Sequence, residues 1–117
     1  NYTATPYIAY LFATVAGVSK VGSYTGTNST LNVDCGFSNG ARFVLLKRTD
    51  SGDPWLLHDS ARGIVSGNDP YLYLNNTLAQ QTGYDPIDPL SSGFTLNGGG
   101  FNSWNASGGT YIFYAIA

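Results

Sequence analysis

Three consecutive residues, His58, Asp59 and Ser60, carry the side-chain types of a serine hydrolase triad. His58 is the only histidine of the chain, so any triad would depend on it. In an extended strand, however, successive side chains point to opposite faces, which keeps Asp59 from orienting the His58 imidazole. The sequence therefore predicts no catalytic residue, and a protein that is not an enzyme.

Asp59 and Arg62 flank a turn that is followed by Gly63, a residue free to adopt a positive φ. A carboxylate and a guanidinium placed in this way form a planar, bidentate pair that holds a polar loop without a large core. We predict that this pair is structural. The functional alternative has Arg62 facing outward, with Trp55 nearby, to bind an acidic sugar or a carboxylate of a partner.

Two groups of oxygen-bearing side chains have the chemistry of Ca²⁺ ligands. Asp85 and Asp88 belong to a loop rich in proline, and Asp53, Asn68 and Asp69 form the second group. Ca²⁺ takes six to eight oxygen ligands, and neither group matches a defined calcium loop. No spacing among these carboxylates selects a pair for glycoside hydrolysis either. We therefore predict no metal and no cofactor.

Aromatic side chains in polar loops are the more plausible binding feature, because sugars stack their apolar faces on such rings. Trp104 follows the Gly-rich segment Gly98-Gly-Gly100, and Tyr71 and Tyr84 are also flanked by turn residues. A sandwich without disulfides nevertheless needs most of its rings in the core. The candidate ligand or partner contacts are therefore Trp104, Tyr71, Tyr84 and Arg62.

The composition favours strands and turns over helices. The chain has 117 residues, enough for one domain, and charged residues make up only 10% of them, with no Glu. The net charge of −2 and the single basic pair Lys47-Arg48 argue against nucleic-acid binding. No apolar run is long enough to cross a membrane. The only cysteine, Cys35, excludes an internal disulfide and is predicted to be a buried small hydrophobe.

Short apolar runs alternate with Gly, Asn, Pro and Ser at intervals that are typical of a β-sandwich. We predict one all-β domain over residues 1–117, an antiparallel sandwich of jelly-roll-like form with little or no helix. The segment Asn76–Ser92 is either a long ordered loop or contains a helical turn at Thr77–Gln81. The predicted strands are Tyr7–Ala13, Ser19–Tyr24, Leu31–Cys35, Arg42–Arg48, Trp55–Asp59, Leu72–Asn75, Gly93–Leu96 and Thr110–Ile116.

The two ends of the chain echo each other. Tyr7-Ile-Ala-Tyr10 is repeated as Tyr111-Ile-Phe-Tyr114, with an Asn six residues before and an Ala six residues after the first Tyr of each copy. Residues 1–13 are therefore either the last strand of a preceding repeat or a strand shared with a neighbouring subunit. A chance likeness between two apolar strands is the third interpretation.

Four strings of the chain, taken in order, resemble a recurring pattern in tailed-bacteriophage structural proteins. The pattern is that of a β-rich, tandemly repeated domain at the C-terminus of tail-fibre-like virion proteins. The resemblance covers essentially the whole chain, and the order of the strings is its specific feature. The strings are Gly40-Ala-Arg-Phe-Val-Leu-Leu-Lys-Arg-Thr-Asp-Ser-Gly-Asp-Pro-Trp55, His58-Asp-Ser-Ala-Arg-Gly-Ile-Val-Ser-Gly-Asn-Asp-Pro-Tyr-Leu-Tyr-Leu-Asn-Asn-Thr77, Ile87-Asp-Pro-Leu-Ser-Ser-Gly-Phe-Thr95 and Asn105-Ala-Ser-Gly-Gly-Thr-Tyr-Ile-Phe-Tyr114.

This resemblance implies a non-enzymatic structural module on the phage particle, in a tail fibre or a similar appendage, that contributes to host attachment. The implied partners are further copies of the chain in a homo-oligomer such as a trimer, other virion proteins and a host surface glycan. Two alternatives stay open. A capsid decoration or head-fibre domain would dock through one flat apolar patch, and a carbohydrate-binding module would need an exposed aromatic cluster ringed by amides.

Overall fold

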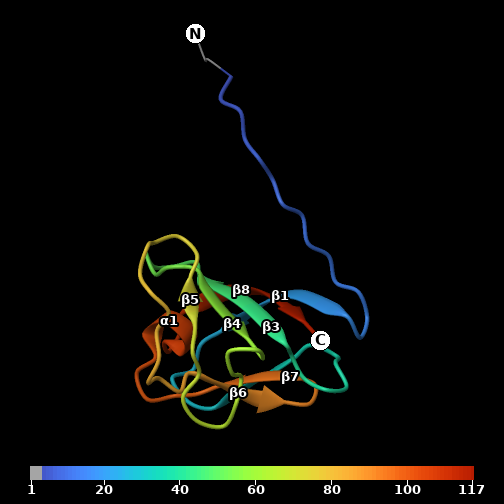
Figure 1. Cartoon of the computed structure of the whole chain (residues 1–117), viewed down its shortest axis with the longest axis vertical. Helices are drawn as coiled ribbons and strands as arrows, with labels where there is room; N and C mark the ends of the chain where they lie inside the picture. The colour runs from blue at the N-terminus through green and yellow to red at the C-terminus, as the bar shows by residue number, and fades with distance from the viewer. Residues whose placement is uncertain (1–3) are drawn as a thin grey trace.

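The computed structural model describes residues 4–117 and contains eight strands (Figure 1). The strands form at short apolar or aromatic runs, and turn residues lie between them. A four-residue helix, α1, is the only helix in that range. The elements are β1 (Ser19–Thr25), β2 (Leu31–Asp34), β3 (Phe43–Arg48), β4 (Leu56–Asp59), β5 (Leu72–Tyr73), β6 (Ile87–Leu90), β7 (Gly93–Leu96), α1 (Asn102–Asn105) and β8 (Thr110–Ile116).

The strands form two antiparallel sheets. Sheet A has five strands in the order β1-β8-β3-β4-β5, and sheet B has three in the order β2-β7-β6. Pairing of β1 with β8 and of β2 with β7 nests the start of the chain against its end, as in a jelly roll. The predicted all-β antiparallel sandwich is thus confirmed, with an uneven division of its strands between the sheets.

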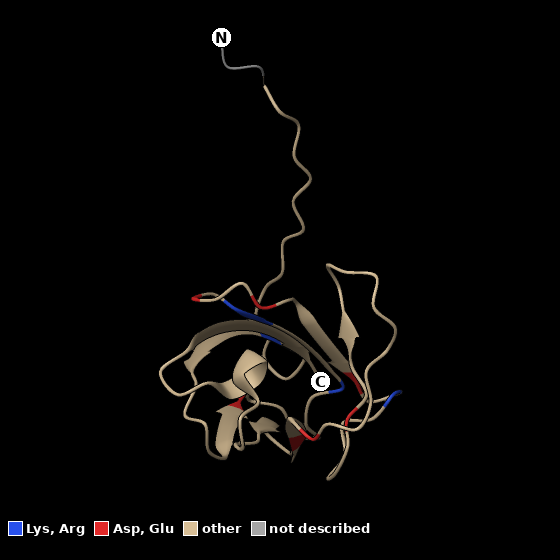
Figure 2. Ribbon diagram, turned by 90° about the vertical axis from the view of Figure 1, so that its left-hand side faces the viewer, with Lys and Arg blue, Asp and Glu red and all other residues tan. Residues whose placement is uncertain are grey.

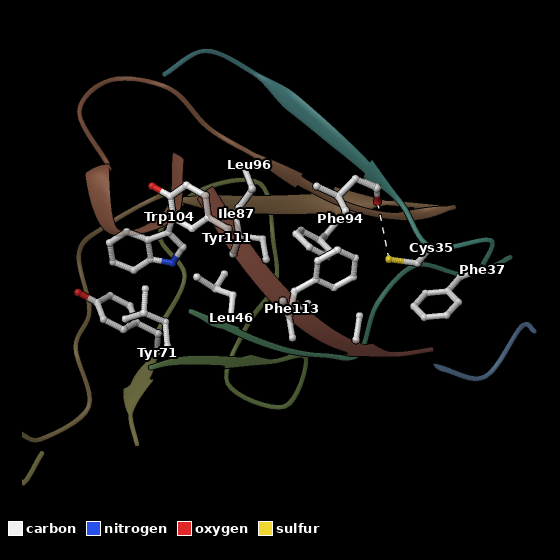
Figure 3. Packing of buried hydrophobic residues seen from close by; sticks show 14 residues of the cluster. Cys35, Phe37, Leu46, Tyr71, Ile87, Phe94, Leu96, Trp104, Tyr111 and Phe113 are labelled. Atoms are coloured by element: carbon white, nitrogen blue, oxygen red, sulfur yellow. Dashed lines mark hydrogen bonds between the residues drawn. The ribbon is translucent and has the colours of Figure 1, made fainter. Parts of the chain in front are cut away.

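The core lies between the two sheets (Figure 3). Leu46 of β3 and Phe113 of β8 point from sheet A toward Phe94 and Leu96 of β7, and the rings of Phe94 and Phe113 meet edge to face at 5.3 Å. Each large side chain that is fully buried stabilises the fold by about 1.5–3 kcal/mol. Cys35 is also buried, as predicted from its apolar surroundings.

The prediction of a strand at Tyr7–Ala13 is wrong. Residues 4–13 are extended but pair with no strand in the described part of the chain, and they project from the domain as an arm (Figure 1). The arm leaves the edge of β1 at Thr14, whose hydroxyl accepts the backbone N–H of Val21 at 3.0 Å. The Thr14 side chain thereby occupies the hydrogen-bonding position at Val21 that the backbone of a paired strand would need.

The segment Asn76–Ser92 contains strand β6, which the sequence analysis did not predict. Pro89 lies inside β6, where it cannot donate a hydrogen bond. The strand tolerates it because β6 is the edge of sheet B, paired only with β7. No helical turn is present at residues 77–81; instead, Gln81 forms an isolated bridge with Tyr71.

Candidate functional site

His58 is sealed in the core. It follows Leu56 by two residues in β4, so both side chains point toward sheet B, and neither is exposed to solvent. Its Nε2 accepts a hydrogen bond from the Trp104 indole at 2.9 Å. Burial lowers the pKa of His58 to about 4, so the imidazole is neutral at physiological pH. The arrangement makes His58 a packed core residue that acts as a hydrogen-bond acceptor.

Neither serine that fits a hydrolase motif is placed for catalysis. Asp59 and Ser60 lie beyond His58, and Asp59 contacts Arg62 instead of the imidazole. Ser38 lies in Gly36-Phe-Ser-Asn-Gly40, which matches the pattern of a nucleophile elbow. That segment, however, joins strands β2 and β3 rather than a strand and a helix. The sequence match is therefore a turn between strands.

Trp104 and Tyr71 are buried, although they were predicted to contact a ligand or partner. Only 6% of the surface of Trp104 and 3% of that of Tyr71 is accessible to solvent. Their rings meet edge to face at 4.9 Å (Figure 3). The His58 ring lies beside both, with centroid distances of 5.5 Å to Tyr71 and 6.1 Å to Trp104. Helix α1 carries Trp104 inward, and the Tyr24 hydroxyl of β1 donates to the Trp104 carbonyl at 2.7 Å. Tyr84, at 50% exposure, is the one candidate ring that is open to solvent.

Arg62 and Asp59 form an ion pair at the end of β4. The Asp59 carboxylate also accepts the backbone N–H of Arg62 at 2.9 Å, and the guanidinium donates to Gln80 at 3.1 Å. These contacts close the turn before Gly63, which has a φ of +138°. Arg62 thus joins the turn to the long segment before β6.

We expect the substitution Arg62→Ala to change the free energy of unfolding by less than about 1 kcal/mol, because the pair lies at the surface. Urea denaturation of the variant beside the wild type measures this difference. A loss of several kcal/mol would show that the turn is held mainly by this ion pair.

The candidate calcium ligands form hydrogen bonds that join loops to neighbouring segments. The Asn97 amide donates to Asp85 at 3.1 Å and to Asp88 at 2.9 Å, which ties the approach to β6 to the end of β7. Asp53 accepts a hydrogen bond from Ser103 at 2.7 Å, and the buried Asp69 accepts the Val65 N–H at 2.9 Å. Within residues 4–117, no three carboxylate, His or Cys side chains are grouped to hold a metal.

On the face of sheet A that points away from sheet B, one line of apolar residues crosses all five strands, while Lys47 and Asp59 lie on the same face to either side of that line. Cross-strand pairing links its residues in one line, because Tyr114 pairs with Val21 and Leu45, and Leu57 pairs with Leu45 and Leu72. We call this line the outer row; it consists of Val21, Tyr114, Leu45, Leu57 and Leu72. An apolar surface that crosses an entire sheet is typical of an interaction site.

The arm meets one end of this face at Phe12, and the residues before Phe12 project from the domain. The Phe12 ring stacks on Tyr114 with 4.4 Å between ring centroids. A hollow of about 230 Å³ lies beside the stack, lined by Phe12, Tyr114, Leu45 and Trp55 among others. Tyr10 borders a second hollow with Trp55 and Leu45. Figure 2 shows that the arm carries no charged residue, so the arm and the outer row together form a continuous apolar site.

This site was not among the functional sites predicted from the sequence. The pattern Phe43-Val44-Leu45-Leu46 in β3, apolar on both faces, is the signal that indicates it. Val44 and Leu46 on one face of that strand pack in the core, so the apolar residues on its other face are buried only if another surface covers them. No helix in residues 4–117 is long and apolar enough to span a membrane.

The comparisons with known proteins identify a family. The family described as a domain of unknown function (DUF7483) matches residues 1–117, so the chain belongs to that family. No curated protein and no solved structure matches the chain.

Proposed function

We propose that this member of the DUF7483 family is a non-enzymatic structural module of a bacteriophage virion surface protein, a tail fibre or a similar appendage. The phage assignment is supported by the ordered strings that resemble tail-fibre-like proteins. In this role the domain assembles with further copies of itself and with other virion proteins, and it contributes to attachment to a host surface glycan.

The observation that carries an architectural role is the apolar outer row together with the uncharged arm. Leaving such a surface in water is unfavourable, by roughly 25 cal/mol for each Å² of apolar area. A domain that retains it gains stability when a neighbour covers it. His58, the residue on which any Ser-His-Asp triad depends, is fully buried in the core.

The outer row also suits the alternative of a capsid decoration or head-fibre domain, because such a domain docks through a flat apolar patch. Location on the particle separates the two functions. For the carbohydrate-binding alternative, two of its three candidate rings, Trp104 and Tyr71, are buried, which leaves Tyr84 as its support.

Immunogold electron microscopy of virions that carry this chain tests the proposal. An antibody raised against residues 1–117 is expected to label fibre tips or another tail appendage. Antibody adsorbed beforehand with the purified domain is the control and is expected to leave no label. Label spread over the head would favour capsid decoration, and unlabelled virions with an accessible epitope would refute the virion role.

A further inference from the structure

We infer that the arm is an assembly strand: residues 7–13 of each chain lie between the outer faces of sheet A of two copies, which pack face to face. This inference rests on the proposed structural role and specifies its partner as a second copy of the chain. Four features of the molecule support it: the exposure of the arm, the direction of its side chains, its sequence, and the face that it meets at Phe12.

The arm exposes large apolar side chains that a lone domain has no reason to keep in water. Leu11 is 90% exposed, Tyr7 89% and Ile8 86%. Within the described residues, the backbone of residues 4–12 takes part in no hydrogen bond. An extended segment with unpaired backbone and apolar side chains is suited to association with another chain.

Alternate side chains of the arm point to opposite sides, because the segment is extended. Tyr10 and Phe12 line the hollows on the outer face of their own sheet A. Leu11, between them, therefore points away from the domain, and so does Tyr7. Only Phe12, at 53% exposure, is partly covered by its own sheet; Tyr10 is 83% exposed and Ile8 86%, so both sides of the arm before Phe12 are apolar and open.

The arm repeats the sequence of β8, a central strand of sheet A. Tyr7-Ile-Ala-Tyr10 matches Tyr111-Ile-Phe-Tyr114 of β8. In β8, Tyr111 is 1% exposed and points into the core, while Tyr114 belongs to the outer row. β8 is apolar on both faces although only the inner one is fully buried, and Ile112 on its outer face is 42% exposed. Apolar residues on both sides of the arm are likewise expected of a segment that becomes covered on both sides in an assembly.

A second copy supplies the missing surface. It presents the same outer row, and the row contains no charged residue, so two rows meet without electrostatic repulsion. One surface patch that serves both partners is the arrangement of a two-fold symmetric interface. Seven extended residues span about 23 Å, and five strands span about 19 Å, so the arm is long enough to cross the sheet.

The first test is the mass of the full chain in solution, measured by size-exclusion chromatography with light scattering. The wild type is expected to be a dimer at micromolar concentration. Leu11→Asp is expected to raise the dimer dissociation constant by at least about tenfold, since it replaces a buried leucine in the interface by a charge. Leu78→Asp changes another exposed leucine, outside the arm and the outer row, and should leave the mass unchanged.

A disulfide test then locates the contact. A tagged chain with Leu11→Cys is mixed with an untagged chain with Ile112→Cys, which lies on the outer face of β8 and is 42% exposed. Mild oxidation is expected to give a mixed disulfide between the two chains. A tagged Leu78→Cys chain is the control partner and should give none above background. The native Cys35 is buried and does not compete.

A monomeric wild type, an oligomer that keeps its mass in Leu11→Asp, or the absence of the mixed disulfide would overturn the inference. These outcomes are independent of the virion assignment. A chain that labels virions yet is monomeric refutes the role of the arm alone. A Leu11-dependent dimer whose antibody labels no virion refutes the phage role alone.

Discussion

Replacing Phe94 by alanine is expected to lower the free energy of unfolding by about 3–5 kcal/mol. Phe94 lies in the middle of β7, is not exposed at all, and packs edge to face on Phe113 of the opposite sheet. Its removal both returns apolar area to water and leaves a cavity, because the backbones of the two sheets hold the surrounding side chains in place. Urea denaturation followed by tryptophan fluorescence measures the loss.

The matched control is Tyr84→Ala, which removes an aromatic ring that is 50% exposed. We expect it to cost less than about 1 kcal/mol, since a half-exposed ring leaves no closed cavity. Equal losses in the two variants would mean that the space between the sheets is not the principal core.

The second large effect concerns pH, and it comes from two buried groups that act in opposite directions. Burial lowers the pKa of His58 from 6.5 to about 4. The unfolded chain therefore binds this proton more readily, and His58 lowers stability as the pH falls from 6.5 to 4. Burial raises the pKa of Asp69 from 3.8 to about 7. The folded chain then binds the proton more readily, so Asp69 lowers stability as the pH rises from 3.8 to 7.

In the wild type these two contributions oppose each other between pH 4 and 6.5. The substitution Asp69→Asn keeps the shape of the side chain and its acceptor for the Val65 N–H, but removes the titration. The variant is therefore expected to lose on the order of 3 kcal/mol of stability between pH 6.5 and 4, the uncompensated His58 contribution, whereas the stability of the wild type changes little over this range. Denaturation curves at these two pH values give the comparison.

The partner substitution His58→Gln should have the reverse effect, with stability falling as the pH rises from 4 to 7. If the Asp69→Asn variant and the wild type show the same pH dependence, Asp69 does not take up a proton in the folded state.

Local sequence was sufficient for most of the fold. Strands β7 and β8 have the predicted bounds, because Asn97-Gly98 directly follows the apolar residues of β7 and Gly108-Gly109 directly precedes those of β8. Strand β6 was missed because Pro89 argues against a strand unless its edge position is known, and that position depends on tertiary contacts. Strand Tyr7–Ala13 was predicted for its residues, but a strand also needs a partner strand.

The candidate site was harder to predict, for physical reasons that differ between residues. Trp104 is surrounded in sequence by Gly, Asn and Ser, yet α1 turns its ring onto His58 and Tyr71, which are distant in the chain. His58 lies two residues after Leu56 and therefore on the same face of β4. This alternation in the sequence could have predicted that the imidazole is buried. The outer row depends on the register of five strands, which no local pattern specifies.

Cryo-electron microscopy of intact virions that carry this chain, at a resolution that separates strands, tests the central claim most directly. The account predicts density for the two-sheet domain in an appendage, with neighbouring copies meeting through the outer row and an arm between them. Copies that meet through sheet B or through loops, with the outer row facing solvent, would contradict the account.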